Sequence, residues 1–165
     1  MTTRTAPQVF DRVIAEDVRD TLIAAAAAGS FNSYDLIRPS SVWDASLFKK
    51  TYLPQFDVRE LEEVKILIAP RNRAIEWASR ASRSREHTVQ VCVMQRCEPD
   101  TPKMDQLMDF CGHIDDYLAN QTGISPSGTA AKWMRSNSDP LYDPKQLDEQ
   151  KVFRGVITIT YQLTR

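Results

Sequence analysis

Residues 48–96 read FKKTYLPQFDVRELEEVKILIAPRNRAIEWASRASRSREHTVQVCVMQR, and this stretch sets the plan of a sheet. Its first half ends in the apolar run Val64–Ala69, which a proline terminates and which is typical of a buried strand. Polarity alternates across Arg85–Arg96 instead, with valine at every second position from Val89 to Val93. The stretch therefore predicts one fully buried and one half-buried strand, joined by a long polar loop.

The joining loop, residues 71–86, is basic and also contains apolar bulk. Five arginines stand between positions 71 and 85 against one glutamate, Glu76. Apolar side chains in a charged loop are more typical of an interface anchor than of a free loop. A solvated loop without a partner explains the arginines equally well. If the loop does grip an acidic surface or phosphates, the expected contact residues are Arg71, Arg73, Ile75, Trp77, Arg80 and Arg83.

A second long loop is predicted over residues 122–150, which are rich in proline and polar residues, with one helical turn at Thr129–Arg135. Its later part is acidic, through Asp139, Asp143, Asp148 and Glu149. Its candidate contact residues are Trp133, Met134, Leu141 and Tyr142. A basic loop and an acidic loop on one chain suit a head-to-tail contact between copies, which closes into a ring. Contact between the two loops within one chain, or no contact at all, is an alternative of comparable weight.

The remaining periodicities predict two helices and a further strand. Apolar residues recur every three or four positions over residues 8–27, and again from Pro102 to near Gly123, after Thr101 as an N-cap. Residues 152–163 alternate in polarity and predict the clearest strand. Two short pieces within residues 33–52 read as edge strands or parts of an extended arm: Tyr34–Ile37 and Ser41–Trp43.

Strands that follow one another without intervening helices favour an antiparallel sheet. We therefore expect an α+β fold, with an antiparallel β-sheet, two amphipathic helices packed on one face, long loops and an extended arm. The length of 165 residues fits a single domain spanning residues 1–165.

Composition narrows the function classes. The 21 basic and 22 acidic side chains give a formal net charge of −1, so no overall basic field attracts nucleic acid. The N-terminus has no apolar signal region, and no run of about 18 apolar residues occurs, so neither classical secretion nor a membrane span is expected. Three cysteines without a C-x-x-C spacing fit a reducing, intracellular origin.

Catalytic and ligand-binding motifs are absent from the sequence. His113 and Cys111 are two positions apart on a predicted helix, which points their side chains away from each other, whereas a helical metal site needs a spacing of three or four. Walker, dinucleotide-glycine and G-x-S-x-G patterns do not occur. The adjacent acidic pairs Glu62–Glu63 and Asp115–Asp116 are explained as charged side chains on solvent-exposed faces, without a catalytic pair of carboxylates. The sequence thus predicts no metal, no cofactor and no enzymatic activity.

Three segments in this order carry a resemblance to a known family: KKTYLPQFDVRELEEVKILIAP (49–70), SRASRSREHTVQVCVMQRC (79–97) and DPLYDPKQLDEQKVFRGVITITYQ (139–162). Together they resemble the bacteriophage tail terminator, or neck (tail completion), proteins of the head–tail joining region. The resemblance covers residues 48–165, with the N-terminal helix in its expected place. Cys92, Cys97 and the Ile75–Trp77 pair are departures from the family pattern.

The resemblance implies an α+β sandwich that assembles as a hexameric ring on the last ring of the tail tube. Such a ring stops tube polymerisation and presents a surface to the head–tail connector or stopper proteins. The implied partners are sister copies, the tail tube protein, the connector and the tape measure protein. DNA only passes through the lumen, no membrane is involved, and the location is the virion neck after assembly in the host cytoplasm. A head-completion or stopper protein is the close alternative, and a nucleic-acid-binding regulator a more distant one.

Overall fold

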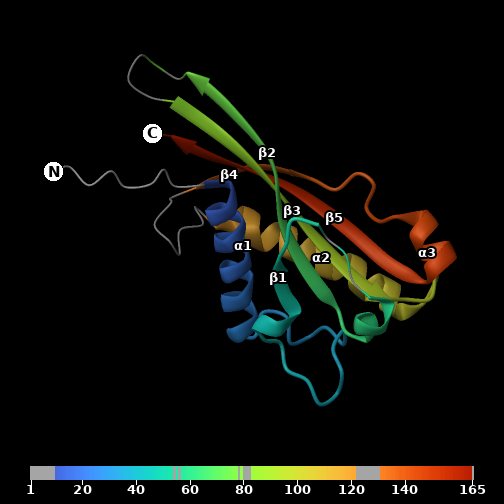
Figure 1. Ribbon diagram of the computed structural model, residues 1–165. Coiled ribbons are helices and arrows are strands. Elements are labelled where there is room, and N and C mark those ends of the chain that lie inside the picture. Colours follow the sequence, from blue (N-terminus) through green and yellow to red (C-terminus); the bar gives the residue numbers. More distant parts are fainter. Residues whose placement is uncertain are drawn as a thin grey trace.

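The protein folds into a five-stranded sheet with helices packed on it. The computed structural model describes residues 10–53, 55, 57–77, 79, 83–121 and 131–164. The strands lie in the order β1-β2-β3-β5-β4 (Figure 1). The elements in chain order are α1 (Phe10–Ala27), the 3-10 turn η1 (Ala45–Leu47), β1 (Phe48–Lys50), the 3-10 turn η2 (Val58–Glu62), β2 (Lys65–Trp77), β3 (Arg83–Arg96), α2 (Pro102–Asn120), β4 (Lys132–Asn137), α3 (Pro144–Gln150) and β5 (Val152–Thr164). The predicted α+β fold is confirmed.

The sheet is mixed, whereas the sequence predicted an antiparallel one. β2, β3, β5 and β4 pair antiparallel, but β1 lies parallel to β2, with Phe48 opposite Ile66 and Lys50 opposite Ile68. A parallel neighbour needs a crossover connection of about a dozen residues. Residues 51–64, which include η2, supply that connection, and the sequence pattern alone did not reveal it.

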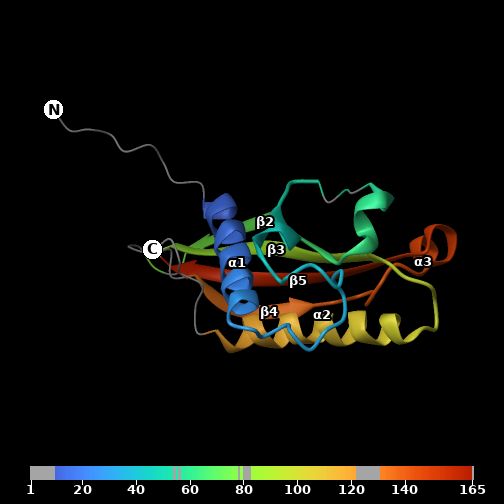
Figure 2. The ribbon, with the colours of Figure 1, turned by 90° about the horizontal axis from the view of Figure 1, so that it is seen from below.

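Both long helices bury their apolar stripes against one face of the sheet. Ile14 and Val18 of α1 join Phe110 and Ile114 of α2 in one cluster with the buried strand residues. Figure 2, which views the sheet edge-on, shows α2 running along this face. The predicted alternation is confirmed, because the cluster takes these side chains from β3 and β5: Val89, Val91, Val93, Phe153, Ile157, Ile159, Tyr161 and Leu163. A smaller cluster around η2 occupies the opposite face: Leu61, Leu67, Cys92, Met94 and Val152.

Several predicted elements differ from the structure. Tyr34–Ile37 and Ser41–Trp43 are not strands, and this segment packs Leu36 and Trp43 into the core of its own chain. Aromatic contacts stabilise it there, including Phe31 against Trp43 with ring centroids 5.6 Å apart. The helical turn predicted at residues 129–135 is wrong for its described part, because β4 begins at residue 132 and pairs with β5; residues 129 and 130 lie outside the described residues.

Close packing of α2 on the sheet depends on a glycine in β5. Gly155 lies opposite Val93 in the β3–β5 register, on the helix face. A Cβ at Gly155 would lie 3.0 Å from the Sγ atom of Cys111 in α2 and 3.0 Å from the ring of Phe153. A side chain at this position would therefore require Cys111 or Phe153 to shift by a few tenths of an ångström.

Replacing Gly155 by alanine is expected to lower the free energy of unfolding by about 1–3 kcal/mol, because the added methyl group overpacks the α2–β5 contact. Urea denaturation followed by circular dichroism measures the change. Gly112→Ala is the matched control. No atom lies within 4 Å of the Cβ position at Gly112, inside α2, so that methyl group should instead raise stability by about 0.5–1 kcal/mol. Equal effects of the two substitutions would contradict the packing account.

Candidate interface surfaces

The basic segment predicted as a loop is the outer half of a β-hairpin. β2 continues to Trp77 and β3 begins at Arg83, so most of residues 71–86 is strand. β5 runs beside it to its end, with Ser84 opposite Thr164, and Figure 1 shows these strands extending beyond α1. The loop prediction is therefore wrong for this segment, because antiparallel pairing continues through its polar residues. Arg80 lies outside the described residues, and only the backbone is described for Trp77 and Arg83.

The base of the hairpin is tied to the start of α1 through one carboxylate. The Oδ1 atom of Asp11 lies 2.6 Å from Nδ1 of His87, and its Oδ2 atom lies 3.4 Å from a guanidinium nitrogen of Arg73. His87 is only 1% exposed and Arg73 faces it across the β2–β3 pairing. Arg73, predicted as a partner contact, thus has an acidic neighbour in its own chain. His87 has a structural hydrogen bond that sequence reasoning missed.

Arg71 occupies a bulge in β2. Pro70 pairs with Val89 and Asn72 with Thr88, which leaves Arg71 as the extra residue. Its Nε atom donates a 2.7 Å hydrogen bond to the side-chain oxygen of Gln90. Arg71, one of the predicted contact residues, is therefore exposed, and its hydrogen bond to Gln90 holds its side chain in place. Ile75, further out on β2, is also exposed, as a contact role requires.

A groove follows the outer edge of β2. β1 ends at Lys50, opposite Ile68, and no strand of the described chain covers β2 from Pro70 outwards. The groove has a volume of about 420 Å³ and is lined by Asp11, Tyr52, Pro70, Arg71, Asn72 and Arg73. Tyr52 and its neighbour Leu53 are 60% and 63% exposed. Sequence reasoning missed this apolar pair, although it follows two lysines in a segment without helical or strand periodicity.

The second predicted contact segment divides into two parts. Trp133 and Tyr142 are half-buried against the core of their own chain, and the Tyr142 ring stacks on Phe153 with centroids 6.2 Å apart. Met134 and Leu141 are exposed, Met134 as the extra residue of a bulge in β4 and Leu141 at 55% exposure. The latter two can therefore meet a partner, whereas the two aromatic residues mainly stabilise the fold.

The acidic part of this segment lies at the far end of the sheet from the hairpin. Its last two acids, Asp148 and Glu149, belong to α3, which is at one end of the molecule in Figure 1 while the hairpin is at the other, and Figure 2 agrees. Asp143 caps α3 by accepting a 3.1 Å hydrogen bond from the backbone N–H of Gln146. The two predicted segments do meet within one chain at β4, where a guanidinium nitrogen of Arg135 lies 3.1 Å from a carboxylate oxygen of Glu86 in β3. The basic and acidic surfaces thus face different directions.

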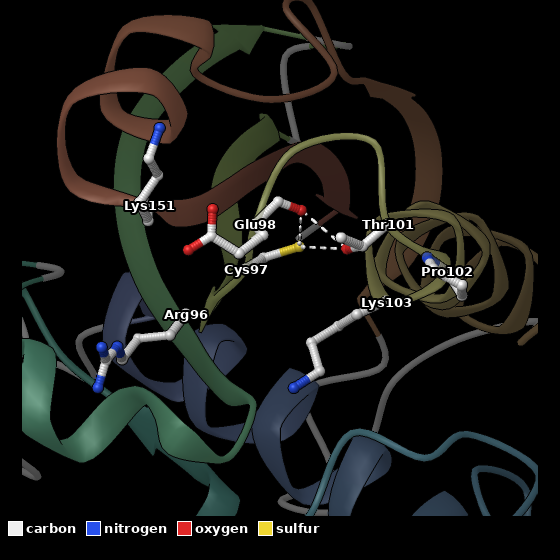
Figure 3. A pocket seen from close by; sticks show the side chains of 7 residues that line it. All are labelled: Arg96, Cys97, Glu98, Thr101, Pro102, Lys103 and Lys151. Carbon is white, nitrogen blue, oxygen red and sulfur yellow. Dashed lines mark hydrogen bonds between the residues drawn. The ribbon is translucent and has the colours of Figure 1, made fainter.

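A further pocket at the start of α2 contains a cysteine without the features of a nucleophile. In Figure 3 the Cys97 Sγ atom lies among backbone and hydroxyl groups, 3.3 Å from the carbonyl oxygen of Glu98 and 3.8 Å from Oγ1 of Thr101. Burial raises the pKa of the Cys97 thiol above its usual value and raises that of Cys111 to about 12. Both thiols therefore remain protonated near neutral pH. Across the described ranges, no three His, Cys, Asp or Glu side chains are placed to hold a metal ion.

Comparisons with known proteins give a fold likeness alone. No family pattern and no curated protein matches the sequence. Among solved structures, a chain of one described as "Virion of native gene transfer agent (GTA) particle" is similar with a TM-score of 0.53 and 8% sequence identity. The match covers 92% of this chain and 95% of that chain, so it extends over nearly the whole fold. Among the described residues, no helix is long and apolar enough to cross a membrane.

Replacing Asp11 by alanine is expected to lower the free energy of unfolding by about 1.5–3 kcal/mol, since it leaves His87 buried without its partner. Arg73→Ala removes only the exposed ion pair with Asp11 and should lower the free energy of unfolding by at most about 1 kcal/mol. Denaturant unfolding of both variants measures the difference. Hydrogen exchange should also become faster at the β2–β3 pairing around His87 in the Asp11 variant. A cost for Arg73→Ala as large as that for Asp11→Ala would contradict this ranking.

Proposed function

We propose that this protein is a structural component of a tailed-phage type of virion, and that it acts by binding and not by catalysis. The observation that carries the proposal is the fold shared with a chain of a gene transfer agent virion over 92% of this chain and 95% of that one. The resemblance of residues 49–70, 79–97 and 139–162 to phage neck proteins supports it independently, because that resemblance rests on sequence pattern alone.

Within the virion, the role proposed is that of the tail terminator. Copies form a hexameric ring on the end of the tail tube, stop its polymerisation and join it to the head connector, while DNA passes through the lumen. The placement of a basic hairpin and an acidic segment at opposite ends supports a head-to-tail contact between copies, which is the kind that closes into rings. A net charge of −1 is compatible with a lumen that does not hold DNA.

The absence of catalytic activity is part of the proposal. The thiols of Cys97 and Cys111 are kept protonated by burial, and His87 is buried with its Nδ1 atom hydrogen-bonded to Asp11. The remaining features of interest are exposed apolar and charged side chains, which bind other surfaces.

A head-completion or stopper protein of the same neck is the second candidate, because the virion likeness supports it as well. The two roles differ in the neighbour that is bound first. A terminator binds the open end of a tail tube, whereas a stopper binds the connector on the head.

Purified protein is expected to form a ring of hexameric mass, measured by native mass spectrometry and seen by negative-stain imaging. Added to polymerising tail tube protein, it should shorten the tubes in proportion to its concentration, because each capped end stops growing. Bovine serum albumin at the same concentration serves as the control for crowding. A chain that remains monomeric when mixed with tail tubes would overturn the terminator proposal, and binding to connectors alone would favour the stopper.

Binding to duplex DNA is expected to be weak and unchanged when Arg80, Arg83 and Arg85 are replaced by alanine. A regulator that used these arginines on phosphates would instead bind with a steep dependence on salt and lose affinity in the triple variant. Fluorescence anisotropy with a labelled duplex at several salt concentrations separates the two cases. Strong, salt-sensitive binding that the triple variant abolishes would replace the structural proposal with the regulatory one.

A further inference from the structure

The groove along the outer edge of β2 has a surplus of positive charge. Its one carboxylate, Asp11, already has both oxygens engaged, one by His87 and the other by Arg73. Arg71 and Arg73 therefore present two guanidinium groups against one carboxylate, which leaves an excess of one positive charge. Arginine side chains in such a position select carboxylates, since the planar fork matches the two carboxylate oxygens.

The rim of this groove is apolar. Tyr52 lines the groove beside β2, where β1 has ended, and Leu53 follows it in the chain; both side chains are more than half exposed. The position of Tyr52 is fixed, because its backbone oxygen accepts from Arg71 and the Lys50 ammonium lies 4.7 Å from the centroid of its ring. An apolar pair next to two arginines favours an occupant that carries an apolar side chain flanked by acids.

The turn formed by residues 138–144, SDPLYDP, has this composition. Leu141 is 55% exposed and Asp139 is also exposed. The turn is held in place by the stacking of Tyr142 on Phe153 and by the capping of α3 through Asp143. Because it is ordered before binding, it loses little conformational entropy on contact.

Groove and turn lie at different edges of the sheet. The groove follows the free edge of β2, whereas the turn directly follows β4, the strand at the opposite edge. No residue of the turn is among those that line the groove. One copy thus offers a groove in one direction and a turn in the other, which is the arrangement of a heterologous contact.

We propose that the 138–144 turn of one copy docks in the β2-edge groove of the next copy, with Leu141 against Tyr52 and Leu53 and with Asp139 facing Arg71. This inference rests on the proposed ring and names the joint between its subunits. The occupant is a second copy of this chain, chosen because the acidic, apolar turn complements the groove in charge and in character.

Charge reversal tests the pairing. Arg71→Glu and Asp139→Arg each place like charges at the joint, and each is expected to raise the concentration at which half the protein is assembled by at least about tenfold. The double variant in one chain should assemble as the unmodified protein does, because its charges are exchanged but still complementary. An equal mixture of the two single variants should also assemble, in alternating order. Native mass spectrometry and sedimentation velocity measure the assembled fraction.

Lys103→Glu is the matched control, since it reverses an exposed charge at the start of α2, outside the groove and the turn, and should leave assembly unchanged. If the unmodified protein stays monomeric, both the ring and the joint are overturned. If it forms rings and both single variants form them equally well, the ring stands and this joint is overturned. Intact rings that lose only their binding to the tail tube would assign the groove to that other protein instead.

Discussion

Strand β3 lies between β2 and β5 and pairs with both along nearly its whole length. This pairing places three long strands in register, so that their inward residues form one continuous apolar face. α1 and α2 can bury their stripes only because that face exists. The close approach at Gly155 and the Asp11–His87 hydrogen bond are consequences of the same register, since each joins a helix to a specific strand position.

The sheet leaves two edges that must not attract unrelated strands. β1 is short, so the outer half of β2 is uncovered, and β4 forms the opposite edge. Both edges contain a bulge, at Arg71 and at Met134, and both carry cations, including Arg73 and Arg135. Bulges and charged side chains are the usual means by which natural sheets discourage edge-to-edge aggregation. The same features make the β2 edge selective, because a partner must satisfy the arginines to bind there.

Local pattern predicted the elements whose apolar residues have one clear period. The alternation of β3 and β5 and the helical stripes of α1 and α2 are such cases. Residues 71–86 lack that period, because polar side chains occupy the outer hairpin, and β4 forms only because β5 offers it an edge. Trp133 and Tyr142 were predicted as contacts from their size, yet their rings pack against their own core. Burial of this kind depends on distant segments, so a single sequence does not reveal it.

Because opposite charges lie on different parts of the surface, the proposed contact between copies of a nearly neutral chain has a defined head-to-tail orientation. The formal net charge of −1 hides two arginines at the β2 edge, Arg71 and Arg73, and two acids, Asp139 and Asp143, after β4 at the opposite edge of the sheet. In the proposed joint, two copies that approach with opposite edges together attract, whereas copies that approach with like edges repel. Each copy added to the proposed assembly leaves one groove and one turn unfilled, so addition continues until the series closes on itself. The rigid pairing of β2, β3 and β5 fixes the angle between groove and turn, and that angle determines whether the series closes into a ring.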